Sequence, residues 1–284
     1  MIFGQPKACL RKFVAAISLL MVATVVLATV ASATVASAAD KPQKKGPPLK
    51  VGQYNPAHDS VEMFEAIEAK QIDVKIIPKD SKLLQVMIEN KSDKPLNIKL
   101  PSAFAGVPVL AQAGLGGGGL GGGGNNNTPQ PMGGGMGMGM GMGGMGMGGM
   151  GGGMFNVAPE KVGKFKLTTV CLEHGKSEPR PAIPYEIKPI ESYTDKLEVQ
   201  ELCRMIGTGK ITQRAAQVAA WHLNSGMSFQ QLAAKQLKFA NGTSRPYFSP
   251  QEIRAGMQVT AMATKLAEQR KKADAKSDSL SQKK

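Results

Sequence analysis

A segment rich in glycine and methionine, residues 113–153, limits what this chain can fold into more than any other feature. It holds 23 of the 34 glycines of the chain. Ordering one residue costs about 1 to 2 kcal/mol of backbone entropy, and glycine has no side chain whose burial could offset that cost. Lengthening a loop from about five to about forty residues adds only about 2 kcal/mol of closure entropy, so a folded domain can carry such a segment. We therefore expect a disordered insertion at the tip of a β-hairpin.

The residues on either side of the insertion, 59–112 and 154–190, have the pattern of a β domain. Six or seven short runs have the apolar alternation or composition of strands, and turn residues separate them. Alternation with period two indicates half-buried strands. Their number and spacing predict a small antiparallel β-sandwich. The runs lie at 72–77, 83–89, 96–100, 107–112, 155–157, 164–172 and 185–187.

Several pairs of residues have the spacing of a capping box, in which the side chain three residues into a helix bonds back to the N-cap, and two of them begin with Asp. Asp59 and Glu62 form the first pair, which predicts a short helix that ends near Lys70. Asp195 and Glu198 form the second pair, and the apolar residues after it recur at helical spacing. Helices are therefore expected at the start of the β domain and directly after it.

The helical pattern continues through residues 194–272. Three further helices are expected to begin after Thr212, Ser228 and Ser249, because each of these residues is a good N-cap ahead of a helical run. Short loops between four helices indicate a small helical domain. The predicted fold class is therefore α+β: a small antiparallel β-sandwich-like domain with a Gly/Met-rich hairpin insertion, followed by a four-helix domain and a basic tail, 273–284.

The N-terminus has the layout of an export signal. Three basic residues precede an uncharged apolar run, 13–39, and the small residues Ala36 and Ala38 suit a signal peptidase. We predict that residues 1–39 are a cleaved signal peptide and that residues 40–58 are a flexible tether. The apolar run is also long enough to stay uncleaved as a membrane anchor. In both cases the rest of the chain lies outside the cytoplasm, in the periplasm or cell envelope or in the medium.

The chain is strongly basic, with a formal net charge of +14. Without the signal peptide, 32 basic residues against 21 acidic ones leave +11. A basic surface attracts polyanions without selecting a sequence. Because no aromatic stacking platform accompanies the charge, we expect no nucleic-acid function. Anionic lipid, a cell-surface polymer or plain solubility are better explanations of the charge in an exported protein.

The methionines of the Gly/Met-rich segment form a candidate Cu(I) site. Thioether sulfurs select Cu(I), and intervening glycines let several sulfurs approach one ion. The pattern resembles the Met-rich motifs of copper transporters and periplasmic copper-resistance proteins, although those motifs usually contain more histidine. The alternative is a spacer that needs no cofactor. The candidate ligands are Met136, Met138, Met140, Met142, Met145 and Met147.

Two cysteines remain after the signal peptide, Cys171 and Cys203. In an oxidising compartment they can form a disulfide, or they can be two buried thiols on apolar faces. A zinc site that adds His174 and His222 has a spacing unlike common zinc motifs. Because no catalytic motif is present, we predict a non-enzymatic protein. A hydrolase with scattered catalytic residues, including Cys171 as nucleophile, is the less favoured alternative.

Four stretches resemble an uncharacterised family of secreted proteins from planctomycete bacteria that carry a Gly-rich insert. The resemblance implies an envelope or extracellular location and brings no known reaction or ligand. Two small modules, the insertion and the lack of a catalytic motif instead favour a partner-binding or structural module whose partner is another protein or an envelope component. The stretches are residues 88–96, 101–108, 170–176 and 214–222.

Overall fold

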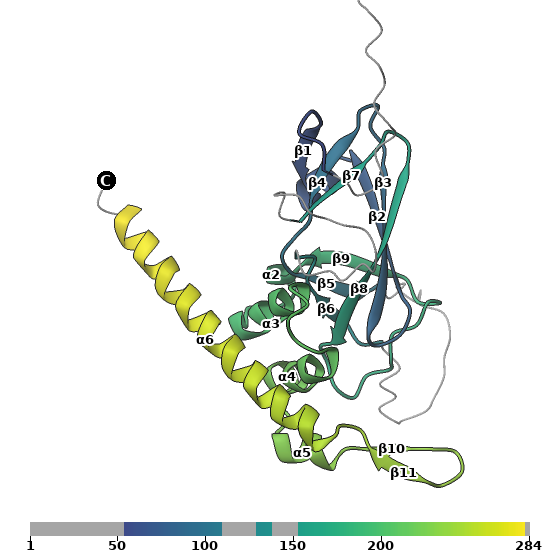
Figure 1. Ribbon diagram of the computed structural model, residues 1–284, viewed down its shortest axis with the longest axis vertical. Coiled ribbons are helices and arrows are strands. Elements are labelled where there is room, and N and C mark those ends of the chain that lie inside the picture. The colour runs from purple at the N-terminus through teal and green to yellow at the C-terminus, as the bar shows by residue number, and fades with distance from the viewer. Residues whose placement is uncertain (1–53, 110–128, 138–152, 282–284) are drawn as a thin grey trace, which may run out of the picture. The chain divides into compact units, whose positions relative to one another are not determined.

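The computed structural model describes residues 54–109, 129–137 and 153–281 (Figure 1). Mainly antiparallel sheets come first and a helical region follows, so the mixed α+β class predicted from the sequence is confirmed. The sheets and the helices belong to one compact unit.

The larger sheet is a closed barrel of six strands, which replaces the predicted sandwich. All neighbouring strands in it are antiparallel. Leu84, Val86 and Ile88 are fully buried in its core, whereas the residues between them are only partly buried. Closure leaves this sheet without an unpaired edge. In order of pairing the strands are β2 (Ile72–Pro78), β3 (Leu83–Asn90), β8 (Val162–Cys171), β6 (Met132–Gly134), β5 (Phe104–Pro108) and β9 (Tyr185–Pro189), which returns to β2.

Strand β6, which the sequence analysis did not predict, closes the barrel. It pairs with β5 on one side and with β8 on the other. The prediction of a disordered insertion is therefore wrong for residues 129–137. Met132 and Met136 are buried in the barrel core, with exposed fractions of 0% and 1%. Apart from Gly153, the rest of the predicted insertion lies outside the described residues.

Close packing explains why a glycine directly follows β6. A Cβ atom on Gly135 would lie 2.5 Å from the carbonyl oxygen of Ser102 and 2.6 Å from that of Cys203. A Cβ atom on Gly207 would lie 2.8 Å from the Cα of Gly135. Gly207 is the last residue of helix α3 (Leu197–Gly207). The barrel backbone and the helix backbone therefore touch, and only glycine fits between them.

A second, three-stranded sheet contains β1 (Asp59–Glu62), β4 (Leu96–Lys99) and β7 (Met154–Val157). The helix predicted from Asp59 to Lys70 is shorter than expected, because the backbone of β1 pairs in parallel with β4. Helix α1 (Met63–Glu68) follows, and the side chain of Glu62 caps it by accepting hydrogen bonds from two backbone N–H groups. Glu62 is thus the N-cap, a role that the sequence analysis assigned to Asp59.

Three of the predicted helix starts are confirmed. Thr212 caps α4, and Ser228 forms a capping box with Gln231 at the start of α5. Ser249 and Glu252 exchange hydrogen bonds at the start of α6. The capping box predicted after Asp195 is absent: α3 starts at Leu197 without a side-chain cap. The elements are α2 (Ile190–Tyr193), α3, α4 (Gln213–Ser225), α5 (Phe229–Ala234), β10 (Gln236–Lys238), β11 (Ser244–Pro246) and α6 (Pro250–Ser281).

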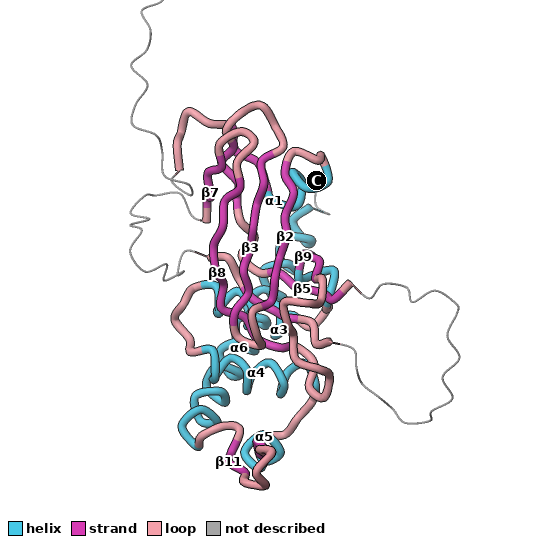
Figure 2. Tube along the Cα trace, turned by 90° about the vertical axis from the view of Figure 1, so that its right-hand side faces the viewer, coloured by secondary structure: helices cyan, strands magenta, loops and turns pink. Residues whose placement is uncertain are grey.

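Helices α3 and α4 lie between the barrel and the long helix α6 (Figure 1). The approach of α4 to α6 is close: a Cβ atom on Gly256 would lie 2.3 Å from a methyl carbon of Val218. Figure 2 shows β2, β3 and β8 side by side, with α4 beyond one end of these strands. Three elements meet at one place in this arrangement: the end of β8, α2 and the end of α4.

Candidate functional site

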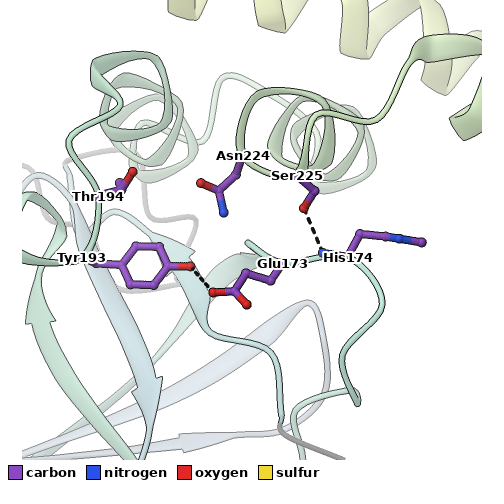
Figure 3. Close-up of a pocket in the computed structure, with 6 residues that line it drawn as sticks. All are labelled: Glu173, His174, Tyr193, Thr194, Asn224 and Ser225. Carbon is purple, nitrogen blue, oxygen red and sulfur yellow. Dashed lines mark hydrogen bonds between the residues drawn. The ribbon is translucent and has the colours of Figure 1, made fainter. Parts of the chain in front are cut away.

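A polar cavity of about 450 Å³ opens where the end of β8, α2 and the end of α4 meet (Figure 3). Each element brings side chains from a different part of the sequence. The lining residues are Glu173, His174, Tyr193, Thr194, Asn224 and Ser225.

Hydrogen bonds between the last residues of α4 and the turn after β8 build the floor of this cavity. The carbonyl oxygen of Leu172 accepts from the Asn224 amide at 2.9 Å and from the Ser225 hydroxyl at 3.3 Å. The Ser225 oxygen in turn accepts from the backbone N–H of His174 at 2.9 Å. The ammonium group of Lys196 donates to the carbonyl groups of Leu223 and Asn224 in the last turn of α4. Its positive charge stabilises the negative end of the helix dipole. The floor is therefore held by polar groups of the protein itself.

Tyr193 and Glu173 form one wall of the cavity. The Tyr193 hydroxyl donates to the Glu173 carboxylate at 2.9 Å, as Figure 3 shows, and Lys176 forms an ion pair with the same carboxylate. Burial, reinforced by the carboxylate next to it, raises the pKa of Tyr193. The phenol consequently stays protonated at neutral pH and is a hydrogen-bond donor rather than a base.

The imidazole of His174 points away from the other lining side chains (Figure 3). It lies edge-on to Trp221, with 4.9 Å between the ring centroids, and its Nε2 is 2.9 Å from Nζ of Lys235. Burial and the charge of Lys235 lower the pKa of His174. The ammonium group therefore donates to a neutral ring, and this histidine is not placed to take a proton from a group in the cavity.

The chemistry available in the cavity is hydrogen bonding. Its side chains offer a carboxylate, a phenol, an amide and hydroxyl groups, most of them already bonded to neighbouring protein atoms. The Ser225 hydroxyl donates to a backbone carbonyl, so it lacks the neighbouring base that activates a serine nucleophile. The side chains that line the cavity are therefore engaged mainly in hydrogen bonds that hold the fold together.

The predicted copper ligands are only partly covered by the structure. Met136 lies in the barrel core, where its thioether packs against apolar side chains. Met138, Met140, Met142, Met145 and Met147 lie outside the described residues. In the part of the chain that is described, no three His, Cys, Asp or Glu residues are grouped so that they could hold a metal ion.

The two cysteines are free thiols. Both are buried, and no disulfide joins them in the structure. Cys171 packs with Trp221 and Phe248, whereas Cys203 packs in a separate apolar cluster between α3 and the barrel. Burial raises the pKa of each thiol to about 12. Both are therefore protonated and weak nucleophiles at neutral pH.

A second cavity, of about 490 Å³, lies beside the barrel at Met136, Gly137 and Gly153. A Cβ atom on Gly153 would lie 3.7 Å from the carbonyl oxygen of Met136. The two described positions that flank residues 138–152 are thus neighbours in space.

A scan against protein-family models, a search of curated proteins and a search of solved structures found no match to this chain. Among the described residues, no helix is both long enough and apolar enough to cross a bilayer.

Sequence reasoning did not find the lining of the polar cavity. The sequence analysis considered His174 only as a zinc ligand and did not single out Glu173. Tyr193 and Asn224 had no signal beyond their positions near helix ends. Nothing local to the sequence indicates that these helix ends meet the turn after β8.

Proposed function

We propose that this chain is a non-enzymatic exported protein of the cell envelope or the extracellular space, and that it binds a partner through its helical region. The export signal expected from residues 1–39 motivates the location. Two features support binding over catalysis. The cavity side chains are engaged in structural hydrogen bonds, and the pKa of Cys171, the nucleophile of the alternative hydrolase, is raised to about 12.

The observation that carries the proposal is apolar exposure on elements that project from the helical region. Met257, Met262 and Leu266 on α6 are 47%, 49% and 39% exposed, and Phe239 beside β10 is 44% exposed. Met262 and Leu266 are four residues apart on a helix, so they lie one above the other on its surface. Exposed apolar side chains that cluster mark interaction surfaces more often than isolated ones do.

Fractionation of cells that express a C-terminally tagged chain tests the location. We expect recovery outside the cytoplasm. Cytoplasmic recovery with an intact N-terminus would contradict the proposal.

Pull-down from the envelope fraction tests the surface. The Met262→Ser, Leu266→Ser double variant should lose the captured partner. A control variant, Leu83→Thr with Val162→Thr, removes two similarly exposed side chains from the barrel and should keep it. Equal capture by all three proteins would remove α6 from the proposal.

Cu(I) binding by Met138, Met140, Met142, Met145 and Met147 is the alternative function. Gly137 and Gly153 are neighbours in space, so a short linker can replace residues 138–152 without stretching the barrel. Such a variant tests this alternative. Removing the longer segment from Met132 to Met154 would destroy β6 and part of β7.

A further inference from the structure

The hairpin between α5 and α6 carries an unbalanced positive charge. We call residues 235–247, which contain β10 and β11, the basic arm. From Leu202 to Gln251 the sequence contains no Asp or Glu. Three basic residues, Lys235, Lys238 and Arg245, lie on the arm. Its own sequence therefore provides no counter-charge.

The arm projects from the helical region with its shape held by hydrogen bonds (Figure 1). Residues 238–246 are all exposed. At the base, the N–H of Tyr247 donates to the carbonyl of Lys235 at 2.7 Å. Near the tip, the N–H of Phe239 donates to the carbonyl of Thr243 at 2.9 Å. The side chains of the arm are consequently presented on a defined scaffold.

Phe239 and its basic neighbours are the distinctive part of this scaffold. The Arg245 guanidinium lies 5.4 Å from the centroid of the Phe239 ring, which is 44% exposed. Among the described residues, neither Lys238 nor Arg245 forms an ion pair, whereas Arg214 in the same acid-free stretch pairs with Glu252. The arm thus combines uncompensated cations with an apolar ring at its surface.

A two-stranded ribbon of three-residue strands buries little apolar surface and is marginal by itself. An exposed aromatic ring beside basic residues suits the boundary of a bilayer, where the ring enters the acyl region and the cations meet phosphate groups. A soluble polyanion would use the charges and leave the ring without a role.

We propose that the basic arm binds the surface of an anionic phospholipid bilayer, with Phe239 inserted and Lys238 and Arg245 on the headgroups. This inference rests on the proposed envelope location and names one partner of the protein there. Because the ribbon is only two strands wide, Lys238 and Arg245, on its opposite faces, can both reach the headgroups.

The test places a tryptophan at the inserted position of the full chain, through Phe239→Trp. The native tryptophan, Trp221, is 3% exposed, so the unmodified chain provides the background emission. Vesicles of equal parts phosphatidylglycerol and brominated phosphatidylcholine should quench the new emission, and vesicles of brominated phosphatidylcholine alone should not. This local signal is independent of any vesicle binding by the apolar residues 13–39.

Reversing the charges of the arm tests how much they contribute to vesicle binding. One basic residue near an anionic surface contributes about fivefold in affinity, so adding Lys238→Glu and Arg245→Glu should weaken the arm's binding at least about 30-fold and remove most of the quenching. The control, Lys164→Glu with Lys166→Glu, makes the same change in net charge on exposed residues of β8 and should keep most of it.

Absent quenching, equal quenching on neutral vesicles, or equal loss in both charge variants would overturn the inference. An emission change with dextran sulfate but no quenching by lipid would assign the arm to a polymer and also overturn it. The fractionation and pull-down experiments test the proposed function separately, so the two failures can be told apart.

Discussion

Replacing Gly135 with alanine tests whether β6 is a structural strand or part of a spacer. The added Cβ would meet three backbone atoms at 2.5, 2.6 and 2.9 Å, from Ser102, Cys203 and Gly207. No side chain can rotate away to relieve these contacts. The barrel and α3 would have to move apart.

Overpacking of a dense core costs about 1 to 3 kcal/mol, and we expect the upper end because the obstructing atoms are backbone atoms. Alanine also restricts the unfolded chain, which offsets about 0.5 to 1 kcal/mol. The net loss in the free energy of unfolding should therefore be about 2 kcal/mol. For a domain of this size the Tm should fall by about 4 to 8 °C.

Urea unfolding followed by Trp221 fluorescence measures this loss, because Trp221 is buried against Phe248 and Tyr247 in the helical region. Gly137→Ala is the matched control on the same segment. An added Cβ there would lie 3.3 Å from the carbonyl oxygen of Gly207, a contact that a small shift relieves, so the loss in the free energy of unfolding should be clearly smaller than in Gly135→Ala. Unchanged stability in Gly135→Ala, or an equal loss in both variants, would refute the packing argument.

Three other predictions concern the metal, the pH dependence and the thiols. Replacing residues 138–152 with a short Gly–Ser linker should abolish competition with a Cu(I) chelator under anaerobic conditions while the protein stays folded. Competition by the wild-type protein should vary little between about pH 5 and 8, since thioethers carry no proton. Equal competition by both proteins would end the copper hypothesis. Burial opposes ionisation of Glu252, but hydrogen bonds from Arg214 and the Ser249 N–H prevail and lower the pKa of Glu252 below 4.5. This ionised carboxylate therefore stabilises the fold above about pH 4.5, and the stabilisation is lost as the pH falls through the lowered pKa. Urea titrations at several pH values should show that Glu252→Gln removes this part of the pH dependence of stability. The same pH dependence in the variant and the wild-type protein would contradict this prediction. Iodoacetamide at neutral pH should label Cys171 and Cys203 only after unfolding, and labelling of the native protein in mass spectra would contradict their burial.

Local signals in the sequence were sufficient for most of the regular elements. The strand pattern at 83–89 became β3, and the helix starts after Thr212, Ser228 and Ser249 were confirmed. These elements are specified by alternation and by caps, which depend on residues a few positions apart.

Long-range contacts decided what local signals could not. The Asp59 cap gave way to pairing of β1 with β4, a partner 37 residues away in the sequence. The polar cavity assembles Glu173, Tyr193 and Asn224 from three separate elements, so no local motif marks it. The disulfide remained one of two alternatives until the structure placed the two cysteines in separate clusters.

The glycines show most clearly which features of this fold the sequence determines and which depend on the tertiary structure. By itself, the sequence determined an α+β chain with short strands, capped helices and a glycine-rich segment between them. Locally, a run such as Gly133 to Gly135 indicates disorder, because glycine gains the least from being ordered. Only the tertiary structure brought α3 so close to the barrel that a Cβ atom has no room there. Pairing of β6 with β5 and β8, which are distant in the sequence, then closes the barrel that stands in place of the expected sandwich.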